Sequence, residues 1–93
     1  MPDPNHLRIL EKGVKAFNDW REKNPFIFPN IVKANLSGAD LSGTDLNRAH
    51  LSEANLSEAD LSGADLRGAD LRDTDLRQAI FELRYDSCYH FNK

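Results

Sequence analysis

The chain has 93 residues and a mass of 10.5 kDa, which is enough for one small domain. Twelve Lys and Arg residues against fifteen Asp and Glu residues give a formal net charge of -3, which argues against a basic nucleic-acid-binding module. No apolar run approaches the roughly 18 residues that a membrane-spanning helix needs, and the N-terminus lacks the pattern of a signal peptide. The single cysteine, Cys88, cannot form an internal disulfide, so we expect a cytoplasmic protein.

An amphipathic helix is predicted for residues 4–23. Asp3 is a suitable N-cap ahead of Pro4, and Asn24 with the following proline ends the pattern. Gly13 weakens the helix interior by about 1 kcal/mol relative to alanine. The polar side of the helix, which includes Arg21, is too mixed in charge for a membrane anchor. Apolar residues recur at spacings of three and four, at Leu7, Leu10, Val14, Phe17 and Trp20.

This helix is expected to cover one end of whatever structure follows it. A stack of repeated units has an open end, and terminal segments must shield that end. The link after the helix is apolar at Phe26, Ile27 and Phe28. These three side chains are predicted to pack beneath the helix.

Ten consecutive five-residue units occupy residues 34–83, and an imperfect unit at residues 29–33 precedes them. Two residues before each centre stands Ala or Thr, and in eight units the residue between is Asn or Asp. The central residue is leucine in nine units and phenylalanine in the tenth, at Leu36, Leu41, Leu46, Leu51, Leu56, Leu61, Leu66, Leu71, Leu76 and Phe81.

A period of five fits neither regular element. On an α-helix, successive leucines would lie about 140° apart and would form no face. On a flat strand, an odd period would send alternate leucines to opposite sides. A chain that turns by a quarter revolution per unit keeps every leucine and every small residue inside. Residues twenty apart then lie above one another, and we expect the Asn and Asp side chains to bond backbone amides at the turns.

The repeat resembles the pentapeptide-repeat family, whose motif is written A(D/N)LXX. This resemblance implies an all-β solenoid, a right-handed quadrilateral β-helix, here with an N-terminal α-helical cap. The predicted division is a capping helix and connector at residues 1–28, the repeat at 29–83, and a C-terminal tail or cap at 84–93. At about 4.8 Å per coil, the repeat would be about 13 Å long.

No catalytic, cofactor-binding or metal-binding residue is assigned, and the protein is expected not to be an enzyme. Ser52 beside His50 would lie on a convex surface without a cleft or an oxyanion site. His50 above Asp70 supplies only two metal ligands, and Cys88 with His90 is equally sparse.

The expected role is that of a structural scaffold or protein-interaction module with a protein partner of unknown identity. The alternative rests on the resemblance, because family members that protect or inhibit DNA gyrase mimic duplex DNA. Residues 34–83 carry ten acidic residues against four arginines, a formal charge of -6. Mimicry needs a long acidic face, however, and this short repeat is interrupted near one end by an arginine collar of Arg67, Arg72 and Arg77. Direct nucleic-acid binding and membrane binding are not expected.

The tail at residues 84–93 departs from the repeat, since Asp86 stands where a central leucine is required. Its aromatic residues Tyr85, Tyr89 and Phe91 suit either a cap on the last coil or a homodimer contact. The first alternative, a monomer, is favoured because ten residues are few for an interface. Deletion of the tail is then expected to promote self-association.

Overall fold

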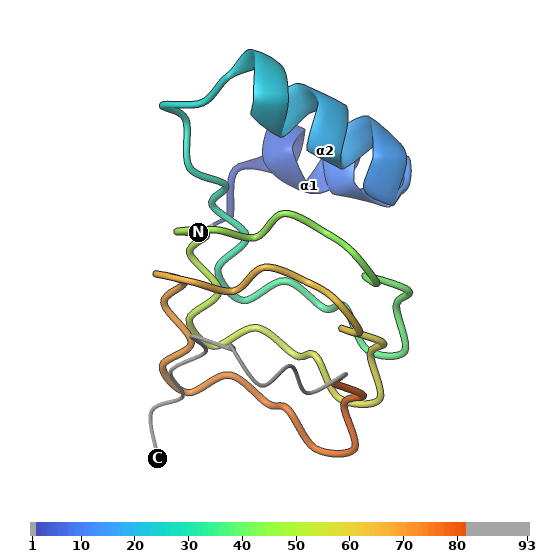
Figure 1. Cartoon of the computed structure of the whole chain (residues 1–93). Coiled ribbons are helices and arrows are strands. Elements are labelled where there is room, and N and C mark those ends of the chain that lie inside the picture. The colour runs from blue at the N-terminus through green and yellow to red at the C-terminus, as the bar shows by residue number, and fades with distance from the viewer. Residues whose placement is uncertain (1, 82–93) are drawn as a thin grey trace.

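The computed structural model describes residues 2–81, and two helices lie at one end of a stack of chain coils (Figure 1). The helices are α1, Pro4–Glu11, and α2, Val14–Lys23. Within residues 2–81, β pairing takes the form of isolated parallel bridges rather than longer strands. Seven bridges join residues twenty positions apart: Asn30 to His50, Asn35 to Asn55, Asp40 to Asp60, Asp45 to Asp65, His50 to Asp70, Asn55 to Asp75 and Asp60 to Ile80. The predicted register of twenty residues per coil is confirmed.

The prediction of one continuous helix over residues 4–23 is wrong. α1 ends at Glu11, and Gly13 then adopts a φ of 118°, a conformation that side chains with a Cβ atom rarely take. The chain restarts as α2, so the glycine breaks the helix rather than only weakening it. The predicted N-cap is confirmed, because Asp3 accepts hydrogen bonds from the backbone of Asn5 at 2.9 Å and of His6 at 3.4 Å.

The central leucines form the core of the stack. Leu46, Leu51 and Leu56 are fully buried, with small residues such as Ala49 and Ala54 buried beside them. Toward the last described coil, Leu76 and Phe81 are only partly buried. The inward assignment of the leucines is therefore confirmed, and the core is densest in the middle of the stack.

Each unit turns through a left-handed residue. The N–H group two residues before each leucine bonds the carbonyl oxygen of the preceding central residue, as from Ala39 to Leu36 at 3.1 Å. The residue two places after each centre has a φ between 59° and 72°, whether it is Gly38 or Glu58. This bond with a positive φ at the third turn position has the features of a type II turn. The five-residue pattern predicts only that this position is exposed, and it carries no signal for the backbone conformation.

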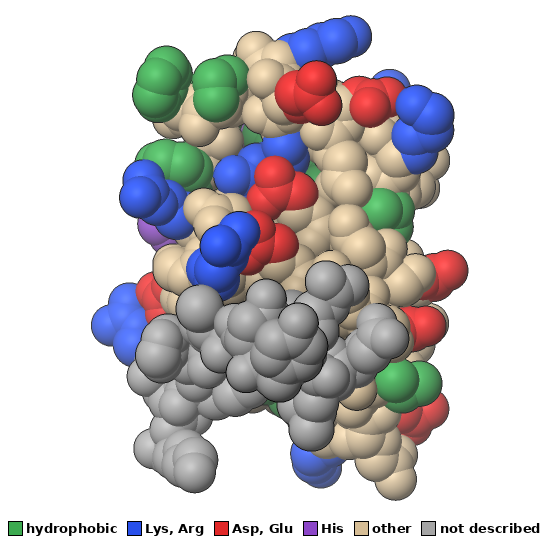
Figure 2. Space-filling view, in the orientation of Figure 1, with side chains coloured by type: hydrophobic (Ala, Val, Ile, Leu, Met, Phe, Trp, Pro, Cys, Tyr) green, Lys and Arg blue, Asp and Glu red, His purple; other side chains and the backbone are tan. Residues whose placement is uncertain are grey.

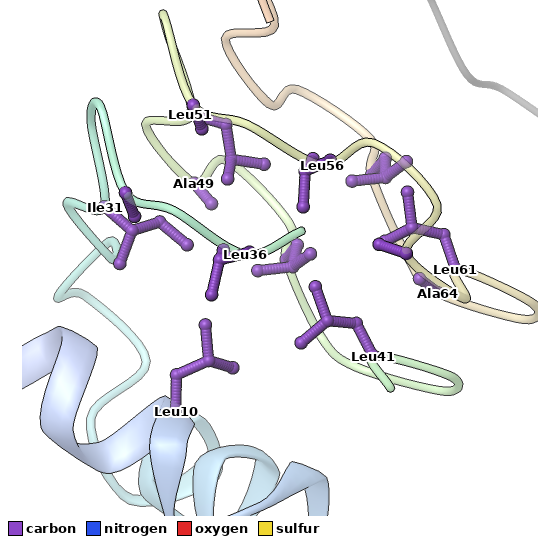
Figure 3. Packing of buried hydrophobic residues seen from close by; sticks show 14 of the residues in the cluster. Leu10, Ile31, Leu36, Leu41, Ala49, Leu51, Leu56, Leu61 and Ala64 are labelled. Carbon is purple, nitrogen blue, oxygen red and sulfur yellow. The ribbon is translucent and has the colours of Figure 1, made fainter. Parts of the chain in front are cut away.

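The helices cover the first coil with apolar side chains. Leu10 of α1 points into the coil toward Leu36, as Figure 3 shows, and Phe17 of α2 is fully buried. Leu7, Ile9 and Trp20 pack against the same cluster. The first coil thus has a hydrophobic lid, which the amphipathic pattern predicted.

The expectation for the apolar connector is wrong in part. Phe26 is 89% exposed and Ile27 is 46% exposed, so neither packs beneath the helices. Phe28 is half-buried, and the guanidinium of Arg48 lies 5.5 Å from its ring centre. An N–H bond from Ile27 to the carbonyl oxygen of Asn24 closes a tight turn, which directs two of the three side chains outward.

Neither helix found within residues 2–81 is long and apolar enough to cross a lipid bilayer. The predictions for the tail at residues 84–93 lie outside the described residues, as does Cys88.

Candidate interaction surface

Asparagine and aspartate side chains on the outer surface of the coils stabilise the turns by hydrogen bonds to the backbone. In nine units the Oδ1 atom before the centre accepts the backbone N–H two residues later, at 3.0 to 3.3 Å. The bond from Ser57 N–H to Asn55 is typical, at 3.0 Å. The predicted local hydrogen bonds are therefore present. Because one oxygen of each side chain accepts a hydrogen bond within its own turn, these residues stabilise the turns and are held in fixed positions on the surface.

The arginine collar is paired with carboxylates. Arg72 donates from Nε to Asp70 Oδ1 at 2.9 Å and from an NH2 group to Oδ2 at 2.7 Å. Arg77 holds Asp75 in the same way, and Arg67 holds Asp65. Each arginine thus forms a fork with the acidic residue two positions earlier. The collar consists of ion pairs rather than a belt of positive charge.

These forks change how the aspartates titrate. Side-chain hydrogen bonds from Arg72, followed by its backbone N–H, lower the pKa of Asp70 to about 2. Arg77 acts likewise on Asp75, whose pKa is also lowered to about 2. The pKa of Asp65 is lowered chiefly by the side chain of Arg67. All three carboxylates are therefore ionised at neutral pH.

Among the described residues, the side of the stack formed by residues 39–43 and 59–63 carries no basic residue. Residues 39–43 and 59–63 are identical ADLSG units, and the bridge between Asp40 and Asp60 stacks one directly on the other. We call Asp40 and Asp60 the acidic column. Their carboxylates accept the neighbouring serine hydroxyls at 2.7 Å and 2.6 Å, and the bond from Ser42 lowers the pKa of Asp40. The column is therefore negative over a side otherwise built of serine and glycine.

Elsewhere the charges are interspersed. On the face shown in Figure 2, Lys and Arg side chains lie among Asp and Glu side chains without a large area of either sign. On the face drawn in Figure 2, the described side chains do not form the long acidic face that mimicry of DNA requires.

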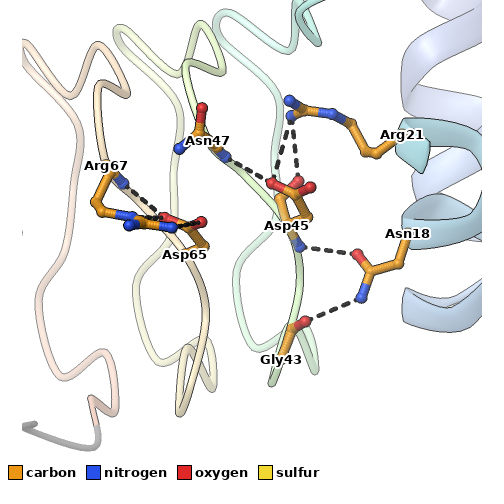
Figure 4. A network of polar contacts seen from close by, with 7 residues as sticks. All are labelled: Asn18, Arg21, Gly43, Asp45, Asn47, Asp65 and Arg67. Atoms are coloured by element: carbon orange, nitrogen blue, oxygen red, sulfur yellow. Dashed lines mark hydrogen bonds and ion pairs between the residues drawn. The ribbon is translucent and has the colours of Figure 1, made fainter. Parts of the chain in front are cut away.

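Polar side chains of α2 bond the backbone of the first coil, as Figure 4 shows. Asn18 accepts the Asp45 N–H at 2.8 Å and donates to the Gly43 carbonyl oxygen at 3.0 Å. Arg21 donates to the Asp45 carbonyl oxygen at 3.2 Å and is only 6% exposed. The placement of Arg21 on the solvated side of the helix was therefore wrong, because its long side chain lies against the coil.

The N-terminus of α1 makes matching contacts on a neighbouring side of the stack, at Asn30. The Nδ1 atom of His6 accepts the Asn30 N–H at 3.0 Å, and the Asp3 N–H donates to the Asn30 carbonyl oxygen at 2.9 Å. The ring of His6 also packs on Trp20, with 4.9 Å between ring centres. Two parts of the coil edge are thereby hydrogen-bonded to the helices.

The residues weighed as catalytic or metal-binding candidates do not combine into a site. His50 is exposed and lies in register with Asp70, and within residues 2–81 no hydrogen bond links its ring to Ser52. No group of three or more potential metal ligands occurs in this part of the chain. The other metal-binding candidate, Cys88 with His90, lies outside it.

An open depression is lined by Ser57, Glu58, Arg77 and Gln78. Its lining residues come from the turns of two successive coils, at positions twenty residues apart. No residue in its lining pairs a nucleophile with a general base.

One comparison with known proteins gives a match. The family model described as pentapeptide repeats matches eight copies of the repeat, over residues 34–73 and 44–82. No curated protein and no solved structure matches the chain.

Proposed function

The chain belongs to the pentapeptide-repeat family, and from this we propose that it is a non-enzymatic protein-interaction module carried by a right-handed quadrilateral β-helix. The observation that supports this role is the use of the outward polar side chains. Most Asn and Asp residues of the repeat bond their own turns, so they hold a rigid, patterned surface in place. Such a surface suits recognition by another protein more than chemistry on a small substrate.

Catalysis is not part of this proposal. A general base must lie within hydrogen-bonding reach of a nucleophile, in a site that excludes water. His50 is exposed, and Ser57 and Ser62 direct their hydroxyl groups to Asn55 and Asp60. The described arrangement supports a binding role.

Mimicry of DNA for a protein such as DNA gyrase is the second candidate, and it is less well supported. The longest dimension is 29 Å, which is less than the roughly 34 Å of one turn of duplex DNA. Arginine forks also neutralise Asp65, Asp70 and Asp75. Within residues 2–81, Asp40 and Asp60 form an acidic column without a basic residue on their side of the stack.

Two experiments test the role together. Immobilised protein is used to capture partners from lysate of the source cells, with Leu56→Asp as the unfolded control. A gyrase supercoiling assay is run in parallel. A partner that binds folded protein and competes with soluble protein supports the interaction module, if supercoiling is unchanged. Stoichiometric inhibition or protection of gyrase would instead favour the DNA mimic.

A further inference from the structure

The helices cover only part of the first coil. At Asn30 and Asp45, both the backbone N–H and the carbonyl oxygen have partners in the helical segment. Between these positions, at Asn35 and Asp40, neither group has a hydrogen-bond partner within residues 2–81. We call residues 35–42 the open edge.

The next coil shows what the open edge would bind. Asn55 donates its N–H to Ala34 at 2.9 Å and accepts from Leu36 at 2.8 Å, and Asp60 makes the equivalent pair of bonds. The carbonyl oxygen of Ser57 accepts the Gly38 N–H at 2.9 Å. In the first coil the corresponding groups point away from the stack toward the helical end, where a preceding coil would lie.

This row has more acceptors than donors. It contains two N–H groups, of Asn35 and Asp40, and four carbonyl oxygens, of Asn35, Ser37, Asp40 and Ser42. The side chains of Asn35, Ser37 and Asp40 are exposed, so solvent and partners reach this part of the coil. Unpaired backbone groups at the edge of a stack pair readily with the backbone of another chain.

The charge at the open edge indicates which kind of peptide it would bind. The acidic column begins at Asp40, on the open edge itself, and continues to Asp60 in the next coil. The bond from Ser42 favours the ionised form of Asp40. Carbonyl oxygens add partial negative charge along the same row. A segment with Lys or Arg beside free backbone N–H groups therefore complements both features.

We propose that the open edge binds a basic peptide segment of a partner protein, which pairs with the unpaired backbone groups on the two sides that meet at the turn from Leu36 to Ala39 and directs cationic side chains to Asp40 and Asp60. This inference rests on the proposed interaction role and names the site and the chemistry of the partner. The helices restrict the pairing to residues 35–42, because they already occupy the backbone at Asn30 and Asp45.

The test uses the full chain and a synthetic peptide of alternating Lys and Thr. Binding is measured by calorimetry, and the site is located by NMR through the amide signals of Asn35 and Asp40. A second peptide of the same sequence carries N-methyl groups on its backbone amides, which removes donors and keeps the charge. We expect the N-methylated peptide to bind at least about tenfold more weakly, corresponding to roughly 1.4 kcal/mol.

Two double variants distinguish the effect of charge at the open edge from the effect of the protein's net charge. Asp40→Asn with Asp60→Asn removes two charges at the column and keeps the turns, since Asn serves the same role at Asn55. Glu53→Gln with Glu58→Gln makes the same change in net charge elsewhere on the coils. We expect the first double variant to weaken peptide binding several-fold and the second to leave it unchanged.

The outcomes distinguish this inference from the general role. Equal binding of the N-methylated peptide, or NMR shifts confined to other residues, would overturn the open-edge site. So would self-association of the protein that protects the Asn35 and Asp40 amides without peptide. A cellular partner that binds the Asp40→Asn, Asp60→Asn variant as well as wild type, with no peptide binding, would leave the interaction module standing without this site.

Discussion

The Oδ1 atom of Asn18 lies 2.8 Å from the backbone nitrogen of Asp45, in the place that a backbone carbonyl oxygen takes one coil later. There, Thr44 accepts the N–H of Asp65 at 3.0 Å. A helix side chain thus substitutes for the backbone of a missing coil. At Asp45 this side chain completes the hydrogen bonding at the edge of the first coil. At the open edge, which no helix side chain reaches, the backbone groups stay unpaired within residues 2–81.

Replacing Asn18 by alanine tests how much its two hydrogen bonds to the first coil stabilise the protein. The variant loses an acceptor for Asp45 and a donor to Gly43, and we expect a loss of about 1 kcal/mol, since water reaches this half-buried position. The control is Asp19→Ala, which removes only an exposed ion pair with Lys15. Urea unfolding curves of both variants measure the difference, and equal stability of the two would show that the Asn18 bonds do not hold the helices down.

Leu56 and Ser57 test the inward and outward assignment. Leu56 is fully buried in the middle of the core, so Leu56→Asp would bury a charge without a partner and unfold the domain. Ser57→Arg should be nearly neutral, because Arg77 occupies the same place one coil later. Thermal melts followed by circular dichroism decide this, and comparable losses in both variants would contradict the assignment.

Replacing Glu58 by glycine is predicted to stabilise the folded protein. Its φ of 62° is a left-handed conformation that costs a residue with a Cβ atom about 1 to 2 kcal/mol, part of which the flexibility of glycine offsets. Glu58→Gly should therefore raise the free energy of unfolding by about 0.5 to 1 kcal/mol. The reverse change, Gly38→Ala, meets no atom within 4 Å of the new Cβ, so any loss there reports backbone strain. Chemical denaturation measures both, and a destabilised Glu58→Gly variant would refute the strain argument.

Acid should weaken the last described coil through Asp70 and Asp75. Their pKa values of about 2 in the folded protein lie below the ordinary value of about 3.9. Stability from these groups is therefore present above about pH 4 and is lost as the pH falls toward 2. Melting temperatures between pH 5 and pH 2 should fall less steeply in the Arg72→Gln, Arg77→Gln variant. An unchanged slope would mean that the forks do not contribute.

Much of the repeat was predictable because one physical rule acts at every unit. A leucine that must be buried fixes the register, and Asn or Asp before it fixes the turn, as with Asn55 and Leu56. The left-handed position was hidden because Glu58 and Gly38 share it. The position requires a backbone conformation, and here both glycine and charged residues such as Glu58 adopt it.

The helical end was less predictable because the repeat does not govern it. Apolar character alone placed Phe26 inside, although the turn closed by Ile27 directs it outward. Arg21 was read as a surface charge, whereas its aliphatic part packs and its guanidinium reaches Asp45. The open edge had no signal in the sequence, since it depends on how far the helices reach across the coil.

Amide hydrogen exchange measured by NMR on the free protein is the most direct test of the open edge. We expect slow exchange for the amides of Asn30 and Asp45, which the helices bond, and for Asn55 and Asp60, which the preceding coil bonds. We expect fast exchange for the amides of Asn35 and Asp40. Exchange at Asn35 and Asp40 as slow as at Asn55 and Asp60 would contradict the open edge and the limited reach of the helices.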